Sequence, residues 1–528
     1  MNTPPAVSES PATVSDQTQQ FRSQVGHISR QSGIYFAGTI FALASGYLFK
    51  VYLARVLGPE DLGLYALGAT LIGFLGIFNT LGLPQSAVRF VASYRAAGKF
   101  KELHALSWRG AGLLLAANVL LAAVLLTFGR VVAIRFYHSP ALVRYLPLFA
   151  LIMLFAVVSG FYGKVLAGYR DIKQRTWIVN FVGTPLNMVF AILLISVGLG
   201  LRGYLIAQVL STAIVCVCLF VAVWRITPGA ARFLGQSGSN PEKEVWSFSV
   251  TMVSIGFLEF LMSQVDKVGL GFYLGARQVG IYSVAAALVA YVPLVLSSIN
   301  QIFAPTISDL HTRGEISMLG RLFQSLTKWA IGLTLPLAMV VIVFARPLMG
   351  IFGTDFERGW PILVIGTVGQ LVNCGVGSVG YLLLMSGNEK RLIRIQTAMA
   401  VVMVVCSAAL IPVFGILGAA AAAAITNIGV NFWNLLEVRR TLGISPYNRG
   451  YLRLLPPTLV SLAVVVLLNR YSFVFRHNWV AIGATFGAAY AVFTGVLLLV
   501  GLQADDRLIA SAIWSRMRGI FVRAGAAA

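Results

Sequence analysis

The sequence predicts an all-α polytopic membrane protein with about fourteen transmembrane helices, in two parallel-related six-helix lobes plus two C-terminal helices. Three observations lead to this prediction: an apolar composition, a series of membrane-length apolar segments, and a sequence pattern that occurs twice. Of the 528 residues, 58% are hydrophobic and only 11% are charged, and the mean hydropathy is +0.82. A soluble protein of this length could not bury so much apolar surface.

Membrane-length segments follow one another along most of the chain. A helix needs about 20 apolar residues to cross the hydrocarbon core of a bilayer. The segments that meet this requirement are 33–57, 62–83, 107–128, 146–167, 177–199, 203–225, 245–272, 279–304, 326–345, 360–386, 393–413, 416–436, 451–469 and 479–501. The first 32 residues are polar and rich in Ser, Thr, Gln and Pro, which predicts a disordered tail and not a signal peptide.

The basic residues between these segments predict the orientation of the chain. With the N-terminus in the cytoplasm, 28 of the 40 Lys and Arg fall in cytoplasmic loops and tails, and 10 fall in outer loops. Cytoplasmic loops of membrane proteins carry an excess of Lys and Arg. We therefore expect both termini to be cytoplasmic. The net charge of +22 reflects membrane orientation and does not predict binding of nucleic acid.

One stretch of sequence occurs twice. KVYLARVLGPEDLGLYALGATL at 50–71 matches 267–288 without gaps, 217 positions further on. The pairs that match include Lys50/Lys267, Gly58/Gly275, Gly63/Gly280 and Tyr65/Tyr282. Weaker echoes pair Gly168 with Gly387, and Gly200 with Gly415.

The repeat predicts a duplicated six-helix unit. Because six is even, both copies share one orientation, and the substrate site is expected between them. The predicted parts are tail 1–32, N-lobe 33–225, cytoplasmic linker 226–244, C-lobe 245–436, two-helix appendix 451–501 and cytoplasmic tail 502–528.

Two stretches near the lobe starts resemble a known family. The pattern from Asp266 to Ala285, and the sequences at 55–71 and 81–94, are similar to the oligosaccharide flippases of the multidrug/oligosaccharidyl-lipid/polysaccharide exporter superfamily. The resemblance implies a protein of the bacterial inner membrane that moves polyprenyl-linked oligosaccharide from the inner to the outer leaflet for surface polysaccharide. A polysaccharide polymerase and glycosyltransferases are the protein partners that it implies.

The seventh apolar segment carries three charged residues, Glu259, Asp266 and Lys267. A charge at the bilayer centre costs roughly 2.5–3.5 kcal/mol on insertion scales, so it usually faces a cavity or a partner. Glu259 and Asp266 share one helical face, which is expected to line a central cavity and to take H⁺ or Na⁺ during transport. The alternative is structural: Asp266 forms a pair, for instance with a Lys or Arg of the other lobe, or it fixes the helix end.

Lys50 and Lys267 occupy matching positions in the two lobes. The phosphate of a lipid-linked sugar needs cations when it leaves water, and these two lysines are candidates. The alternative is that both reach outward to the membrane interface. Arg89 is a candidate for contacting the head group at the cytoplasmic entrance, or else an ordinary positive-inside anchor.

The sequence contains no Walker phosphate loop, no HExxH motif and no Cys/His metal set. We therefore expect no ATP hydrolysis, no metal, no cofactor and no catalytic residues. A cation-coupled drug or metabolite antiporter of the same superfamily and a peptidoglycan-precursor flippase remain alternatives. A polysaccharide polymerase or ligase would need a large outer loop, which the predicted segments do not leave.

Overall fold

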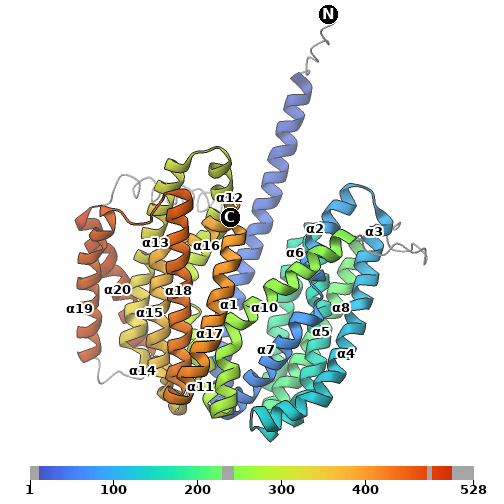
Figure 1. The fold of residues 1–528 in the computed structure, drawn as a ribbon, viewed down its shortest axis with the longest axis horizontal. Helices are drawn as coiled ribbons and strands as arrows, with labels where there is room; N and C mark the ends of the chain where they lie inside the picture. The colour runs from blue at the N-terminus through green and yellow to red at the C-terminus, as the bar shows by residue number, and fades with distance from the viewer. Residues whose placement is uncertain (1–10, 229–242, 472–478, 502–528) are drawn as a thin grey trace, which may run out of the picture. The chain divides into compact units, whose positions relative to one another are not determined.

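The computed structural model describes residues 11–228, 243–471 and 479–501, and these residues contain helices and no strands (Figure 1). The first helix, α1, runs from Pro11 to Asn79. Residues 11–32 are therefore helical where a disordered tail was expected; no proline interrupts the chain between Pro11 and Pro59. Residues 1–10, most of the linker and the tail 502–528 lie outside the described residues.

The chain forms two compact units, called unit 1 and unit 2 here. Unit 1 contains the chain up to Leu53 with Leu71–Val132 and Pro140–Phe257, and unit 2 contains Ala54–Thr70, Ala133–Ser139 and the chain from Leu258. The helices after α1 that belong to unit 1 are α2 (Leu83–Ala96), α3 (Phe100–His104), α4 (Gly110–Val131), α5 (Leu146–Gly168), α6 (Ile172–Thr176), α7 (Thr184–Leu194) and α8 (Gly200–Ile226). These two units are defined by contacts and are not the two lobes that the sequence repeat predicts, and the lobe boundaries stay a prediction.

Helix α10 (Lys243–Leu274) begins in unit 1 and ends in unit 2. The remaining helices of unit 2 are α11 (Ala276–Val289), α12 (Leu294–Thr312), α13 (Ile316–Val343), α14 (Ala345–Gly350), α15 (Trp360–Val376), α16 (Val379–Met385), α17 (Glu389–Phe414), α18 (Ile416–Leu442), α19 (Leu455–Tyr471) and α20 (Trp479–Val500). Short π and 3₁₀ turns join them at η1 (Ala105–Arg109), η2 (Val132–Phe136), η3 (Pro140–Tyr145), η4 (Trp177–Gly183), η5 (Ile195–Leu199), η6 (Thr354–Gly359) and η7 (Arg449–Leu454).

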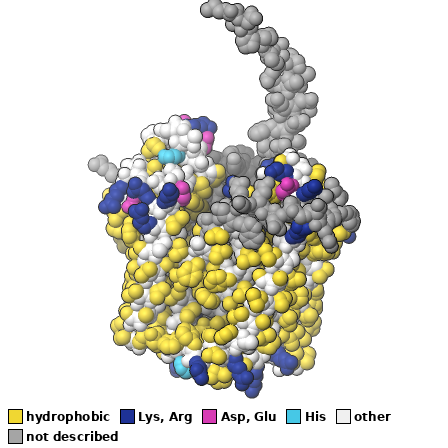
Figure 2. All heavy atoms as spheres, turned by 45° about the vertical axis from the view of Figure 1, so that its right-hand side comes forward, with side chains coloured by type: hydrophobic (Ala, Val, Ile, Leu, Met, Phe, Trp, Pro, Cys, Tyr) yellow, Lys and Arg dark blue, Asp and Glu magenta, His cyan; other side chains and the backbone are white. Residues whose placement is uncertain are grey.

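Each unit has its own apolar core. In unit 1, α5 packs against α2, α4 and α8, and Phe161 is fully buried among them. In unit 2, α18 packs against α15 and α17, and Phe323 of α13 is fully buried in the core. Figure 2 shows hydrophobic side chains over most of the face in view, while Lys and Arg gather near its upper and lower edges. This surface is that of a multi-pass membrane protein.

Among the described residues, ten helices are long and apolar enough to cross a membrane, or eleven if the bent pair Ala276–Val289 and Leu294–Gln301 forms one span. The expected number was fourteen. Phe41–Asn79 and Ile172–Ile226 have 39 and 55 residues, and each covers two expected spans. Helix α10 is not among the ten. The count of fourteen stays a prediction.

The same unusual backbone recurs at the repeated glycines. Gly58 has φ 75° and ψ 177°, and Gly275 has φ 80° and ψ −177°. Gly200 has φ 50° and ψ −134°, and Gly415 has φ 60° and ψ −131°. Residues other than glycine rarely adopt these angles. The sequence echoes therefore coincide with backbone that glycine alone adopts easily.

The remaining sequence match, of Gly168 with Gly387, is shifted in the structure. The left-handed residue before Asn388, the N-cap of α17, is Gly387, with φ 77°. In unit 1 the left-handed residue before Asp171, the N-cap of α6, is Arg170, with φ 62°. Arg170 and not Gly168 therefore corresponds to Gly387. The sequence comparison missed this because Arg170 adopts a backbone conformation that usually selects glycine.

Candidate functional site

The candidate site is built on α10, where Glu259, Asp266 and Lys267 lie in unit 2. The side chain of Glu259 is exposed, although it lies in an apolar part of the helix. Ser263, one turn further on, is also exposed, and its hydroxyl donates to the carbonyl of Glu259 at 2.7 Å. The middle of α10 therefore presents a polar strip with a carboxylate on it.

Asp266 lies on the same helical face but is buried, with 7% of its surface exposed. The hydroxyl of Tyr282 on α11 donates to one carboxylate oxygen, and the backbone N–H of Lys267 donates to the other at 2.7 Å. Both oxygens thus have donors within unit 2. This arrangement supports the structural interpretation of Asp266, in which it fastens the end of α10 to α11. Sequence reasoning did not identify Tyr282 as its partner.

Lys267 is partly buried, and its Nζ donates to the side-chain oxygen of Gln264 at 2.8 Å. Gln264 precedes Lys267 by one turn, so the ammonium group points back toward the middle of α10. Long side chains in helices generally lean toward the N-terminus, so this direction does not separate the two interpretations, and the role of Lys267 stays a prediction.

The other two candidates, Lys50 and Arg89, lie in unit 1 and are exposed. Lys50 is on α1, eight residues before the kink at Gly58. Arg89 is on α2, and its guanidinium carbon lies 5.3 Å from the centroid of the Phe90 ring. Lys50 and Arg89 thus belong to unit 1 and the three α10 residues to unit 2, and a shared role of the five candidates stays a prediction.

The C-terminal end of α10 packs against the segment Ala133–Ser139, which belongs to the same unit. The ring of Phe136 lies 4.7 Å from that of Phe272, centroid to centroid. Tyr137 is buried against Gly271, where any Cβ would come within 2.8 Å of the Tyr137 ring. Burial raises the pKa of the Tyr137 phenol above its ordinary value.

The helix that follows Gly58 and the helix that follows Gly275 touch where both contain glycine. A Cβ at Gly63 would clash with the carbonyl of Ala276, and a Cβ at Gly280 would clash with the carbonyl of Pro59. Gly63 and Gly280 are equivalent in the repeat, and Pro59 is equivalent to Ala276. The contact, called the glycine crossing here, is therefore reciprocal. It lies within unit 2.

No group of three or more His, Cys, Asp or Glu that could hold a metal ion occurs among the residues that the structure describes. The four cysteines are free thiols. What the site offers is an exposed carboxylate, a lysine directed along the helix and several amide and hydroxyl groups. Such groups bind and release polar cargo or protons; they do not constitute a nucleophile with an adjacent base.

Comparison with known proteins identifies the family. Residues 28–311 match the model of the family described as polysaccharide biosynthesis protein, and residues 252–374 match the MatE model. The chain is 27% identical over 321 residues to the succinoglycan biosynthesis transport protein ExoT of Rhizobium meliloti, covering 59% of this chain and 60% of ExoT. It is 21% identical to the probable flippase AglR of Haloferax volcanii, covering 78% of this chain and 83% of AglR.

The fold also has a solved counterpart. The inward closed structure of the lipid II flippase MurJ superposes with a TM-score of 0.69 at 15% identity, covering 88% of this chain and 97% of MurJ. At this identity the match concerns the fold. The family model, in contrast, covers more than half of the chain. The chain belongs to the polysaccharide biosynthesis protein family, and its fold is that of the lipid II flippase MurJ.

Proposed function

We propose that the protein is a flippase that moves polyprenyl-(pyro)phosphate-linked oligosaccharide from the inner to the outer leaflet of a bacterial inner membrane. It works by alternating access between the two predicted lobes, without ATP hydrolysis, and supplies surface polysaccharide biosynthesis. Both termini lie in the cytoplasm. Family membership and the names of ExoT and AglR, a transport protein and a probable flippase, support this proposal.

The observation that carries the proposal is the exposed carboxylate of Glu259 within a membrane-length helix. An ionised side chain that faces lipid at that depth would cost several kilocalories per mole, so this face is expected to meet water or polar cargo. A water-filled polar path is what a sugar needs to pass the hydrocarbon core. Glu259 therefore lines the path and exchanges H⁺ or Na⁺ during the cycle.

Lys50 and Lys267 bind the phosphate or pyrophosphate of the cargo. The Nζ of Lys267 donates to the side-chain oxygen of Gln264, so the ammonium group lies beside other polar groups of α10. With a negative cell interior, each net negative charge carried outward gains about 2.3 kcal/mol per 100 mV. Cations that accompany the head group would cancel part of that gain. Arg89 receives the head group at the cytoplasmic entrance.

A reconstituted flipping assay tests the proposal. Purified protein is placed in liposomes with a fluorescent polyprenyl-pyrophosphate sugar, with and without an inside-negative potential. We expect outward movement by the wild type. Glu259→Gln and the double variant Lys50→Ala/Lys267→Ala should be slower by about tenfold or more, which corresponds to about 1.4 kcal/mol of lost stabilisation.

Two exposed residues outside the candidate site provide matched controls. Glu315→Gln removes a carboxylate just before α13, and Lys101→Ala removes a lysine from α3. Both controls should flip at the wild-type rate. A wild type that moves no sugar-lipid would refute the flippase proposal. Normal flipping by the double lysine variant would refute only the role of the lysines.

A cation-coupled antiporter is the second candidate, favoured by the match of residues 252–374, which contain Glu259 and Asp266, to the MatE model. In the same liposomes an antiporter would move a small cationic dye against a proton or Na⁺ gradient. Dye transport without sugar-lipid transport would establish this function in place of flipping.

A further inference from the structure

A groove in unit 2 lies away from the candidate site, between α13, η7, α19 and α20. It contains about 900 Å³ of empty space, including its open mouth. Both α19 and α20 pack against α13. All three helices contain segments long and apolar enough to cross a membrane, so the groove runs within the membrane-spanning part of the protein.

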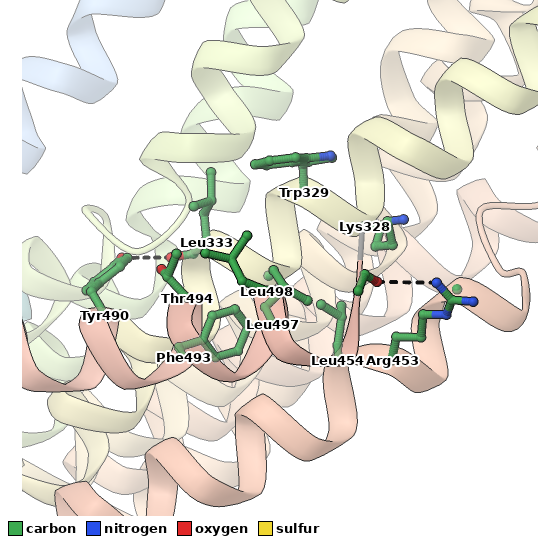
Figure 3. A pocket seen from close by; sticks show the side chains of 13 residues that line it. Lys328, Trp329, Leu333, Arg453, Leu454, Tyr490, Phe493, Thr494, Leu497 and Leu498 are labelled. Atoms are coloured by element: carbon green, nitrogen blue, oxygen red, sulfur yellow. Dashed lines mark hydrogen bonds between the residues drawn. The ribbon is translucent and has the colours of Figure 1, made fainter. Parts of the chain in front are cut away.

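Apolar side chains line most of this groove. Leu333 of α13, Leu454 of η7, and Phe493 and Leu497 of α20 form its walls (Figure 3). The hydroxyl of Tyr490 is already used, because it donates to the carbonyl of Leu333 at 2.7 Å. These walls suit a hydrocarbon chain and offer few polar groups to anything else.

Two cationic residues, Lys328 and Arg453, lie together at one end of the groove, opposite Tyr490 (Figure 3). Lys328 has only 7% of its surface exposed, which is unusual for a lysine. Arg453 donates one N–H from Nη1 to the carbonyl of Gly501 at 3.3 Å. A guanidinium group has five N–H donors, and its planar fork suits a phosphate.

We propose that this groove binds an anionic phospholipid. One acyl chain lies between α13 and α20, and the phosphate contacts Arg453 with Lys328 beside it. The positive charge stands where α19 begins and α20 ends, which is where lipid phosphates lie along a membrane-spanning helix. Basic pockets between transmembrane helices are known to bind anionic head groups.

The occupant is a phospholipid and not the glycan-bearing cargo, because the polar end of the groove is small. Lys328 and Arg453 provide charge for one phosphate, whereas an oligosaccharide needs many hydrogen-bonding groups. The remaining lining is mostly apolar, with four leucines, three glycines, one phenylalanine and one tryptophan, and only Tyr490 and Thr494 add polar side chains. The site is therefore independent of the transport path that contains Glu259.

Native mass spectrometry of the purified full-length protein tests the proposal. The probes are phosphatidylglycerol, phosphatidylcholine with the same acyl chains, and polyprenyl monophosphate. We expect the wild type to retain phosphatidylglycerol in preference to phosphatidylcholine. Arg453→Ala should weaken this retention by about tenfold, the usual order for loss of a hydrogen bond to a charged group. Arg453→Lys should recover part of it.

Two further variants separate the site from general lipid contact. Arg470→Ala removes an exposed arginine from the last turn of α19, the helix that follows η7, and should leave retention unchanged. Thr494→Phe fills the groove without changing its charge and should lower retention of phosphatidylglycerol. Melting temperatures provide a second readout, since a ligand that binds only the folded protein raises the melting temperature. Phosphatidylglycerol should therefore stabilise the wild type more than Arg453→Ala.

Three results would overturn the proposal. One is equal retention of phosphatidylglycerol and phosphatidylcholine by the wild type. Another is unchanged retention by both Arg453→Ala and Thr494→Phe. The last is displacement of phosphatidylglycerol by polyprenyl monophosphate at equal concentration, which would assign the groove to a prenyl chain.

Discussion

The turns at Gly58 and Gly275 have nearly the same backbone but different side-chain chemistry around them. Both glycines have φ near 80° and ψ near 180°. Before the second turn, Asp266 accepts hydrogen bonds from Tyr282 and from the backbone of Lys267. The position equivalent to Asp266 before the first turn is Phe49. The turn geometry thus tolerates little change, whereas the preceding helix accepts either a carboxylate or an aromatic ring.

The contacts made by the residue three positions before each turn glycine also differ between the two copies. Arg55, before the first turn, donates from Nε to the carbonyl of Ile351 at 2.8 Å. The equivalent residue before the second turn is Phe272, which packs on Phe136. A cation with a polar contact in one copy thus corresponds to a ring with an apolar contact in the other. Backbone conformation and glycine contacts are therefore the parts of the repeat on which the structure depends most.

The largest effect is expected at the glycine crossing. Gly63→Ala and Gly280→Ala each place a methyl group against backbone, which cannot move aside as a side-chain end can. Each should lower stability by about 3 kcal/mol, the upper end for overpacking, and the two effects should be similar. Melting temperatures of the purified variants measure this.

Gly46→Ala is the matched control for the crossing. Gly46 lies in α1, and a Cβ there would meet nothing within 4 Å. Alanine at a helical glycine should leave stability unchanged or raise it by about 0.5–1 kcal/mol. If only one of the two crossing variants were destabilised, the contact would not be reciprocal in solution.

A smaller effect is expected where the two copies differ. Tyr282→Phe removes a hydroxyl donor from the buried carboxylate of Asp266, leaving the backbone N–H of Lys267. A hydrogen bond to a charged group contributes about 1.5–3 kcal/mol, so the melting temperature should fall measurably. Tyr273→Phe, at an exposed tyrosine of α10, is the control and should have little effect. Equal stability of Tyr282→Phe and the wild type would show that Asp266 does not need this donor.

The smallest effect is expected at Arg277, just after the second turn. Its Nη2 lies 2.7 Å from Oδ1 of Asp355, but the two side chains are 54% and 56% exposed. Exposed ion pairs contribute about 0–1 kcal/mol and are screened by salt. Arg277→Ala should therefore change stability by less than about 1 kcal/mol at low salt and by nothing measurable at high salt. The residue equivalent to Arg277 in the first copy is Glu60, so the ion pair of Arg277 with Asp355 is not shared by the two copies of the repeat.

Sequence alone predicts the helical membrane class and the repeated turns, because both depend on local properties. Composition identifies the apolar segments, and the backbone angles at positions 58 and 275 favour glycine at each of them. Side-chain partners depend on packing, so the bond between Tyr282 and Asp266 could not be read from the sequence. The same is true of the groove between α13, α19 and α20, which brings Lys328 next to Arg453. Arg170 was missed for a different reason, because it replaces glycine in a left-handed position.

The reciprocal form of the glycine crossing has a consequence for how such a chain could arise. If one six-helix copy were a separate polypeptide, Gly63 of each molecule would meet the residue at position 59 of the other, which is how a two-fold homodimer interface is built. In that dimer a single substitution would disturb two contacts at once. In the fused chain each glycine of the crossing takes part in one contact, so a substitution disturbs only that contact. The side chains around the crossing can therefore change independently in the two copies.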